Sequence, residues 1–106
     1  MAFVPNWKED NSELLVKAIL QLEDEEDVYR FLDDLCTITE IKSMAQRMHV
    51  AKMLYEEATY NVIASETGAS TATISRVNRC LNYGAEGYQR VLKKLEKQKK
   101  ESDHEK

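Results

Sequence analysis

A short stretch of small polar side chains with two arginines lies between residues 71 and 79. Hydroxyl and methyl groups of this size can approach base edges closely, and guanidinium groups bind phosphate oxygens or guanine. The candidate DNA-binding residues of this stretch are Thr71, Ala72, Thr73, Ser75, Arg76 and Arg79. Their chemistry predicts contacts with nucleic acid, provided that one helix presents them together.

The surrounding residues have the spacing of a helix-turn-helix, over about residues 59–82. Gly68 stands where the first helix should end, since glycine readily adopts the left-handed turn. Ser70 can cap the second helix, and the small Ala64 lets the two helices cross closely. The apolar positions expected in the core are Ile63, Ala69, Ile74 and Val77. In such a unit the N-terminal residues of the second helix read the major groove of double-stranded DNA.

The alternative is a plain helical hairpin whose Ser/Thr-rich face is solvated. Such a hairpin would serve an interaction or architectural module that uses the motif only for packing. Arg76 and the hydroxyls beside it favour the DNA-binding interpretation, because packing alone does not require them.

The distribution of charge also favours an anionic partner, although the net charge of the chain is −4. Residues 1–40 carry three basic and eleven acidic side chains, whereas residues 41–106 carry twelve basic and eight acidic ones. No carboxylate occurs from residue 67 to residue 85. The local charge decides whether phosphates can approach, so the second half is the one expected to bind DNA.

The elements that must position these residues are all helices. Gly and Pro are nearly absent before residue 68, and no long alternation typical of a strand occurs. Five helices are expected over residues 12–22, 24–36, 37–55, 60–67 and 71–81, and a sixth around Val91, Leu92 and Leu95. Asp24 and the capping box of residues 37–40 mark two of the helix starts. We expect one domain over residues 1–106, with a disordered tail from about residue 97.

The third helix is apolar around much of its circumference, because Met44, Met48 and Met53 alternate with other apolar side chains. A chain of 106 residues offers little interior to cover such a helix from all sides. A homodimer that wraps this helix would supply the missing cover.

No catalytic or metal-binding arrangement is visible in the sequence. Cys36 and Cys80 are 44 positions apart, and the only histidines are His49 and His104. We expect both cysteines to be reduced and buried, and we expect no metal or cofactor. The chain lacks a Ser-His-Asp set, a glycine-rich phosphate loop and a paired-carboxylate site, so it is not expected to be an enzyme.

The start of the chain does not read as a targeting segment, since charged residues follow Pro5 almost at once. No apolar run exceeds four residues, far short of the ~20 that cross a bilayer. A cytoplasmic location without membrane contact is therefore expected.

Three stretches resemble the Trp repressor superfamily, and most closely its YerC/YecD branch. They are residues 35–41 (LCTITEI), 47–51 (RMHVA) and, above all, 68–84 (GASTATISRVNRCLNYG). The resemblance covers over half of the chain. It implies a six-helix, all-α fold that forms an intertwined homodimer with two DNA-reading heads, and a transcriptional regulator, more specifically a repressor.

The resemblance also assigns roles to individual residues. Thr71, Ala72 and Ser75 match family positions that face bases, and Thr73 matches one near phosphate. Three further residues match the pocket for the tryptophan co-repressor: Arg47 and Arg76, which enclose the indole, and Thr37, which lines the pocket.

Two departures from the family pattern argue against a response to tryptophan. Val77 stands where tryptophan-responsive proteins have a glycine, and its stiff side chain would occupy space that the ligand needs. Cys80 replaces a serine and is a poor acceptor for an α-amino group. The set formed by Thr37, Arg47, Arg76, Val77 and Cys80 therefore reads as the remnant of an effector pocket, and tryptophan binding is not expected.

Overall fold

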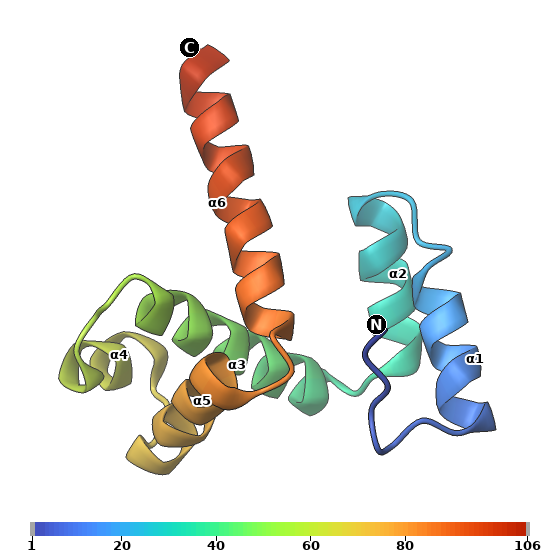
Figure 1. Ribbon diagram of the computed structural model, residues 1–106, viewed down its shortest axis with the longest axis horizontal. Helices are drawn as coiled ribbons and strands as arrows, with labels where there is room; N and C mark the ends of the chain where they lie inside the picture. Colours follow the sequence, from blue (N-terminus) through green and yellow to red (C-terminus); the bar gives the residue numbers. More distant parts are fainter. Residues whose placement is uncertain (1, 106) are drawn as a thin grey trace. The chain divides into compact units, whose positions relative to one another are not determined.

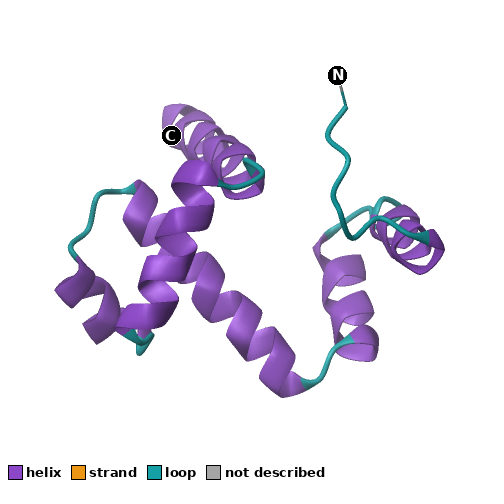
Figure 2. Ribbon diagram, turned by 60° about the horizontal axis from the view of Figure 1, so that its bottom comes forward, coloured by secondary structure: helices purple, strands orange, loops and turns teal. Residues whose placement is uncertain are grey.

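The computed structural model describes residues 2–105, and this part of the chain contains six α-helices and no strand (Figures 1 and 2). The helices are α1 (Asp10–Ile19), α2 (Glu25–Leu35), α3 (Ile38–Tyr55), α4 (Tyr60–Thr67), α5 (Thr71–Tyr83) and α6 (Gly87–Glu105). The all-α prediction with six helices is confirmed. No helix among the described residues is long and apolar enough to span a membrane.

The chain divides into two compact units, one ending at Ile38 and the other beginning at Thr39. The first unit holds α1 and α2. Helix α1 starts at Asp10, two residues before the expected Ser12. Its N-cap is Glu9, whose N–H donates a hydrogen bond to Ser12 Oγ at 2.8 Å, so Ser12 lies inside the first turn of the helix. Asp24 caps α2 as predicted, accepting a hydrogen bond from the Asp27 N–H at 2.9 Å.

The first unit leaves much apolar surface uncovered. Neither α1 nor α2 contains a buried residue. Leu14 and Leu20 are 70% and 74% exposed, and Val28, Tyr29 and Leu35 are exposed as well. Two helices alone cannot enclose a core, since each covers only one side of the other.

The second unit has a continuous core that holds the helix-turn-helix. Its buried residues come from all four helices and from the turn between α4 and α5: Val50, Ala51, Met53, Ile63, Ala69, Ile74, Val77, Leu81 and Leu92. Only the second half of α3 enters this core. Ile38 at its start is 71% exposed and Met44 is also exposed, so the first half of this helix carries uncovered apolar side chains.

Helix α6 follows the turn after α5 and runs away from α4 (Figure 1). The Gln89 side chain donates to the Leu81 carbonyl and ties the start of α6 to α5. The helix continues through residues 97–105. Lys, Gln and Glu are good helix formers, and Lys100 pairs with Glu96 at 3.8 Å one turn away, so nothing in this segment breaks the helix. Residue 106 lies outside the described residues.

Candidate nucleic-acid interface

Hydrogen bonds near each helix end build the turn between α4 and α5. Thr59 caps α4 by accepting from the Val62 N–H at 3.3 Å. Gly68 ends α4 in the left-handed conformation, at φ 74°. Ser70 then caps α5, accepting from the Thr73 N–H at 3.1 Å. These geometries confirm the expected turn residues, and Ser70 and Thr73 also bring their hydroxyl oxygens within 3.1 Å of each other.

Buried side chains fix the orientation of α5. Ile74 and Val77 point into the core together with Leu81, and Ile63 on α4 is fully buried against them. The opposite face of α5 is therefore presented outward. Five of the six candidate DNA-binding residues are exposed there and Thr73 is half-buried: Thr71, Ala72, Thr73, Ser75, Arg76 and Arg79. The structure thus brings the whole predicted set onto one helix.

Further hydrogen bonds that the sequence analysis did not predict hold the turn between α4 and α5. Gln46 on α3 donates to the Thr67 carbonyl at 3.1 Å, at the end of α4. The Thr67 hydroxyl donates to the Ile63 carbonyl at 2.7 Å and accepts from the Ala69 N–H at 3.1 Å. The position of Thr67 directly before Gly68, which ends the helix, could have predicted the two bonds of the Thr67 hydroxyl. The contact with α3 has no local signal.

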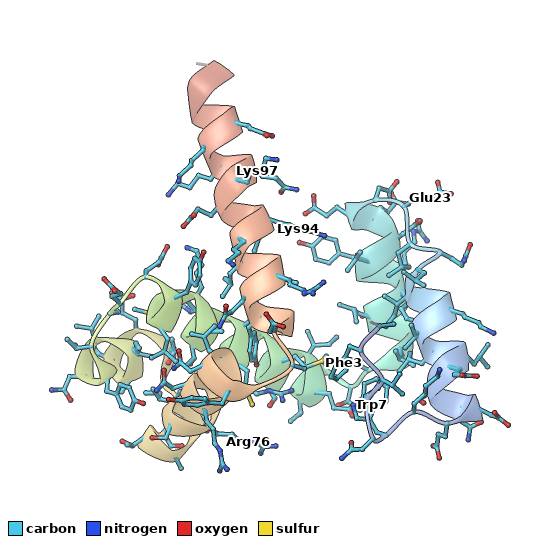
Figure 3. The ribbon with its side chains drawn as sticks, viewed as in Figure 1. Phe3, Trp7, Glu23, Arg76, Lys94 and Lys97 are labelled. Atoms are coloured by element: carbon cyan, nitrogen blue, oxygen red, sulfur yellow. The ribbon has the colours of Figure 1, made fainter. Side chains whose placement is uncertain are left out.

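The charge at this surface is positive. The sequence from residue 67 to residue 85 has no carboxylate, and none of the ion pairs among the side chains of residues 2–102 includes Arg76 or Arg79. Figure 3 shows Arg76 projecting from the ribbon of α5. Helix α4 adds no cation, since Tyr60, Asn61 and Val62 are its exposed residues at this end. The arginines of this surface therefore come from α5.

A cavity of about 370 Å³ adjoins the inner side of α5. Its lining comes from α3, α5 and α6: Ser43, Gln46, Arg47, Thr73, Arg76, Val77, Cys80 and Tyr88. Four of the five residues predicted for the remnant effector pocket are thus brought together. Thr37 belongs to the other unit and is not among the lining residues.

Arg47 contributes a buried polar atom to this region. Its Nε is shielded from solvent and has no hydrogen-bond partner. Two guanidinium groups therefore face one cavity whose lining contains no carboxylate. Sequence reasoning missed Ser43, Gln46 and Tyr88. The spacing of Ser43 to Gln46 and Arg47, three and four positions, could have indicated the two α3 residues, whereas Tyr88 lies at the cavity only through the packing of α6.

The cysteines differ from the prediction in one respect. Both are free thiols, but Cys36 is only half-buried and Cys80 is exposed rather than buried. Cys80 lies on the side of α5 that faces the cavity, where only part of its surface is covered. No group of three or more His, Cys, Asp or Glu residues is placed to hold a metal ion in the part of the chain that the structure describes.

The family model for the Trp repressor protein matches residues 10–96, which include every residue named for this surface and cavity. The chain belongs to the Trp repressor family. It is 58% identical over 88 residues to the uncharacterized protein YerC of Bacillus subtilis (strain 168), a match that spans 83% of this chain and 85% of YerC.

Two solved structures support the same assignment. A TrpR-like protein from Eubacterium eligens matches with a TM-score of 0.80 and 58% identity, over 83% of this chain and 91% of that one. A protein from Staphylococcus aureus, described as a candidate Trp repressor, matches with a TM-score of 0.80 and 47% identity, over 84% and 89%. The Trp repressor family has a regulatory DNA-binding fold and is not a family of enzymes.

Proposed function

We propose that this protein is a sequence-specific transcriptional regulator, acting as a repressor, that reads the major groove of double-stranded DNA with α5. The observation that carries the proposal is the exposed N-terminal half of α5, where Thr71, Ala72 and Ser75 stand beside Arg76. Methyl groups suit thymine, hydroxyls bind bases or phosphates, and a guanidinium binds phosphate or guanine. The identity to YerC supports placing the protein in the YerC/YecD branch. It would act in the cytoplasm and catalyse no reaction.

The working form is an intertwined homodimer. Its support is the apolar surface of α1, α2 and the first half of α3, none of which is buried by the residues of a single chain. A second copy that covers this apolar surface removes it from water, and each Å² of apolar area buried in this way stabilises the dimer by about 25 cal/mol. A dimer also places two copies of α5 on one DNA site, which raises affinity and selectivity.

The regulator does not respond to tryptophan. Val77 is 2% exposed and lies on the wall of the same cavity as Arg47 and Arg76, so its isopropyl group is fixed by the core. Enlarging a packed site to admit a ring next to a fixed side chain costs about 1–3 kcal/mol. Cys80 on the same wall offers a weak acceptor.

Selection from a random pool of duplex DNA tests the proposal directly. The purified protein should enrich a defined sequence, and its affinity should fall as salt rises from 50 to 200 mM, because phosphate contacts release counterions. Arg76→Ala should flatten this salt dependence by about one counterion. Enrichment of no sequence, with equal retention of all fragments, would favour an architectural role. Absence of binding at low salt would favour a protein-interaction module.

A further inference from the structure

Helix α6 carries a row of cations along one side. Between residues 90 and 100 it holds six basic side chains and one carboxylate, a net charge of +5. Four of the basic residues follow Arg90 at three, four, seven and ten positions, and this spacing places all five on one face of the helix, within about 120°. We call this face the basic stripe: Arg90, Lys93, Lys94, Lys97 and Lys100. The same periodicity places every other residue from 90 to 100 outside the face, so neither a carboxylate nor an apolar side chain interrupts the stripe.

The basic stripe is open to solvent, and little of its charge is compensated. All five of its side chains are exposed. Lys100 pairs with Glu96 at 3.8 Å, and none of the other ion pairs among the side chains of residues 2–102 includes a member of the stripe. The packed side of α6 is the opposite one, where Leu92 is buried in the core and Tyr88 is half-buried. Packing of α6 within its own unit therefore does not account for the stripe.

The length of the basic stripe suits a nucleic-acid backbone. From Arg90 to Lys100 the stripe is about 15 Å long, since an α-helix rises ~1.5 Å per residue. One strand of duplex DNA presents a phosphate about every 3.4 Å along its axis, so the stripe can face about four phosphates. The stripe also extends beyond residue 96, where the match to the family model ends, because α6 continues to Glu105. An unbroken row of cations of this length matches a regular row of phosphates.

We propose that the basic stripe binds the phosphate backbone of a second segment of duplex DNA, in addition to the segment read by α5. The inference rests on the proposed function, to which it adds a second DNA contact. Lys94 and Lys97 project from α6, well apart from Arg76 on α5 (Figure 3). Helix α6 also runs away from α4, the other helix of the helix-turn-helix (Figure 1). A straight duplex held on the outward face of α5 leaves the stripe free, so the protein can bridge two segments.

A membrane surface fits the basic stripe less well than DNA does. A helix that lies on a bilayer buries its apolar side among the lipids while its cations face the headgroups. The apolar side of α6 includes Leu92, which is already buried in the core of its own unit. Contacts with phosphates alone carry no sequence information, so the second DNA segment can have any sequence.

A bridging assay tests the inference. A short duplex with the sequence that the protein selects is fixed on beads and loaded with protein, and a fluorescent duplex without that sequence is added at 50 mM salt. The wild type should retain the fluorescent duplex, and retention should fall steeply at 200 mM salt, because phosphate contacts release counterions. The variant Lys94→Gln with Lys97→Gln should retain at least fivefold less, with unchanged affinity for the selected duplex. Glutamine is a good helix former, so α6 should remain intact.

The matched control is Lys17→Gln with Lys99→Gln, which changes the net charge by the same amount. Both lysines are exposed, and neither belongs to the ion pairs among the side chains of residues 2–102. Lys99 lies on α6 but on the side opposite the basic stripe. This control should retain the fluorescent duplex as the wild type does. Lys94→Arg with Lys97→Arg keeps the charges of the stripe and should also behave as the wild type.

Equal retention by the Lys94 and Lys97 glutamine variant and its matched control overturns the inference and leaves the proposed function standing, because the selected duplex is still bound. If the glutamine variant instead loses affinity for the selected short duplex and the wild type does not bridge, the stripe contacts the same segment as α5, which also overturns it. Equal retention together with weaker binding to phosphatidylglycerol vesicles would assign the stripe to a lipid surface. Failure of the wild type to select any sequence would refute the proposed function and, with it, the second segment.

Discussion

Replacing Gly68 by alanine should destabilise the protein through the backbone alone. Gly68 has φ 74°, and a Cβ built on it would find no atom within 4 Å. The left-handed conformation costs an L-residue about 1–2 kcal/mol, and alanine returns ~0.4–1 kcal/mol by restricting the unfolded chain. The expected net loss in the free energy of unfolding is about 1 kcal/mol. Because the side chain meets nothing, no steric term adds to this figure.

Gly87→Ala is the matched control. Its Cβ would also meet no atom within 4 Å, but Gly87 starts α6 without a positive φ. In this variant alanine only restricts the conformations of the unfolded chain, so the free energy of unfolding should rise by ~0.5 kcal/mol. The two alanine variants should therefore differ by about 1.5 kcal/mol, although each adds one methyl group to an open position.

Urea denaturation at one fixed protein concentration measures both values, since the stability of a dimer depends on concentration. Gly68→Asn should recover part of the loss, because asparagine adopts the left-handed region more readily. Equal shifts for Gly68→Ala and Gly87→Ala, or a Gly68→Ala variant as stable as the wild type, would show that the turn does not depend on the left-handed conformation.

Three further outcomes are expected. Ser70→Ala removes the hydrogen bond from the Thr73 N–H at 3.1 Å and should lower the free energy of unfolding in urea by about 1 kcal/mol. Ser65→Ala, on the exposed side of α4, should lower it little, and equal losses would contradict the capping role. Ala72→Leu should change the DNA sequence enriched from a random pool, and each lost base contact should weaken binding by ~1–3 kcal/mol. Ala85→Leu, after α5, should leave the enriched sequence unchanged. If Ala72→Leu enriches the same sequence as the wild type, α5 does not read bases at this position. Calorimetry should detect no saturable tryptophan binding below ~100 µM, and a tenfold rise in DNA affinity (~1.4 kcal/mol) on adding tryptophan would refute the proposed insensitivity.

The sequence by itself determined the parts of this protein that depend on near neighbours. Gly68, Ser70 and Asp24 act on backbone groups within four residues of themselves, so their types and positions predicted the helix ends. The spacing of Ile74 and Val77 predicted the buried side of α5, because a helix returns to the same face every three or four residues. The outward face that carries Thr71, Ala72 and Ser75 follows from the same periodicity.

Only the tertiary structure decided what distant elements do together. The hydrogen bond from Gln46 to Thr67 joins residues 21 positions apart, and the cavity brings Tyr88 of α6 to Arg47 of α3. Such contacts depend on how helices cross in space, and no periodicity within one helix specifies that crossing. The half-exposed state of Val91 and Leu95 was undecided for the same reason: an apolar stripe shows that a helix has a face to bury, but packing alone sets how much of that face its own chain covers.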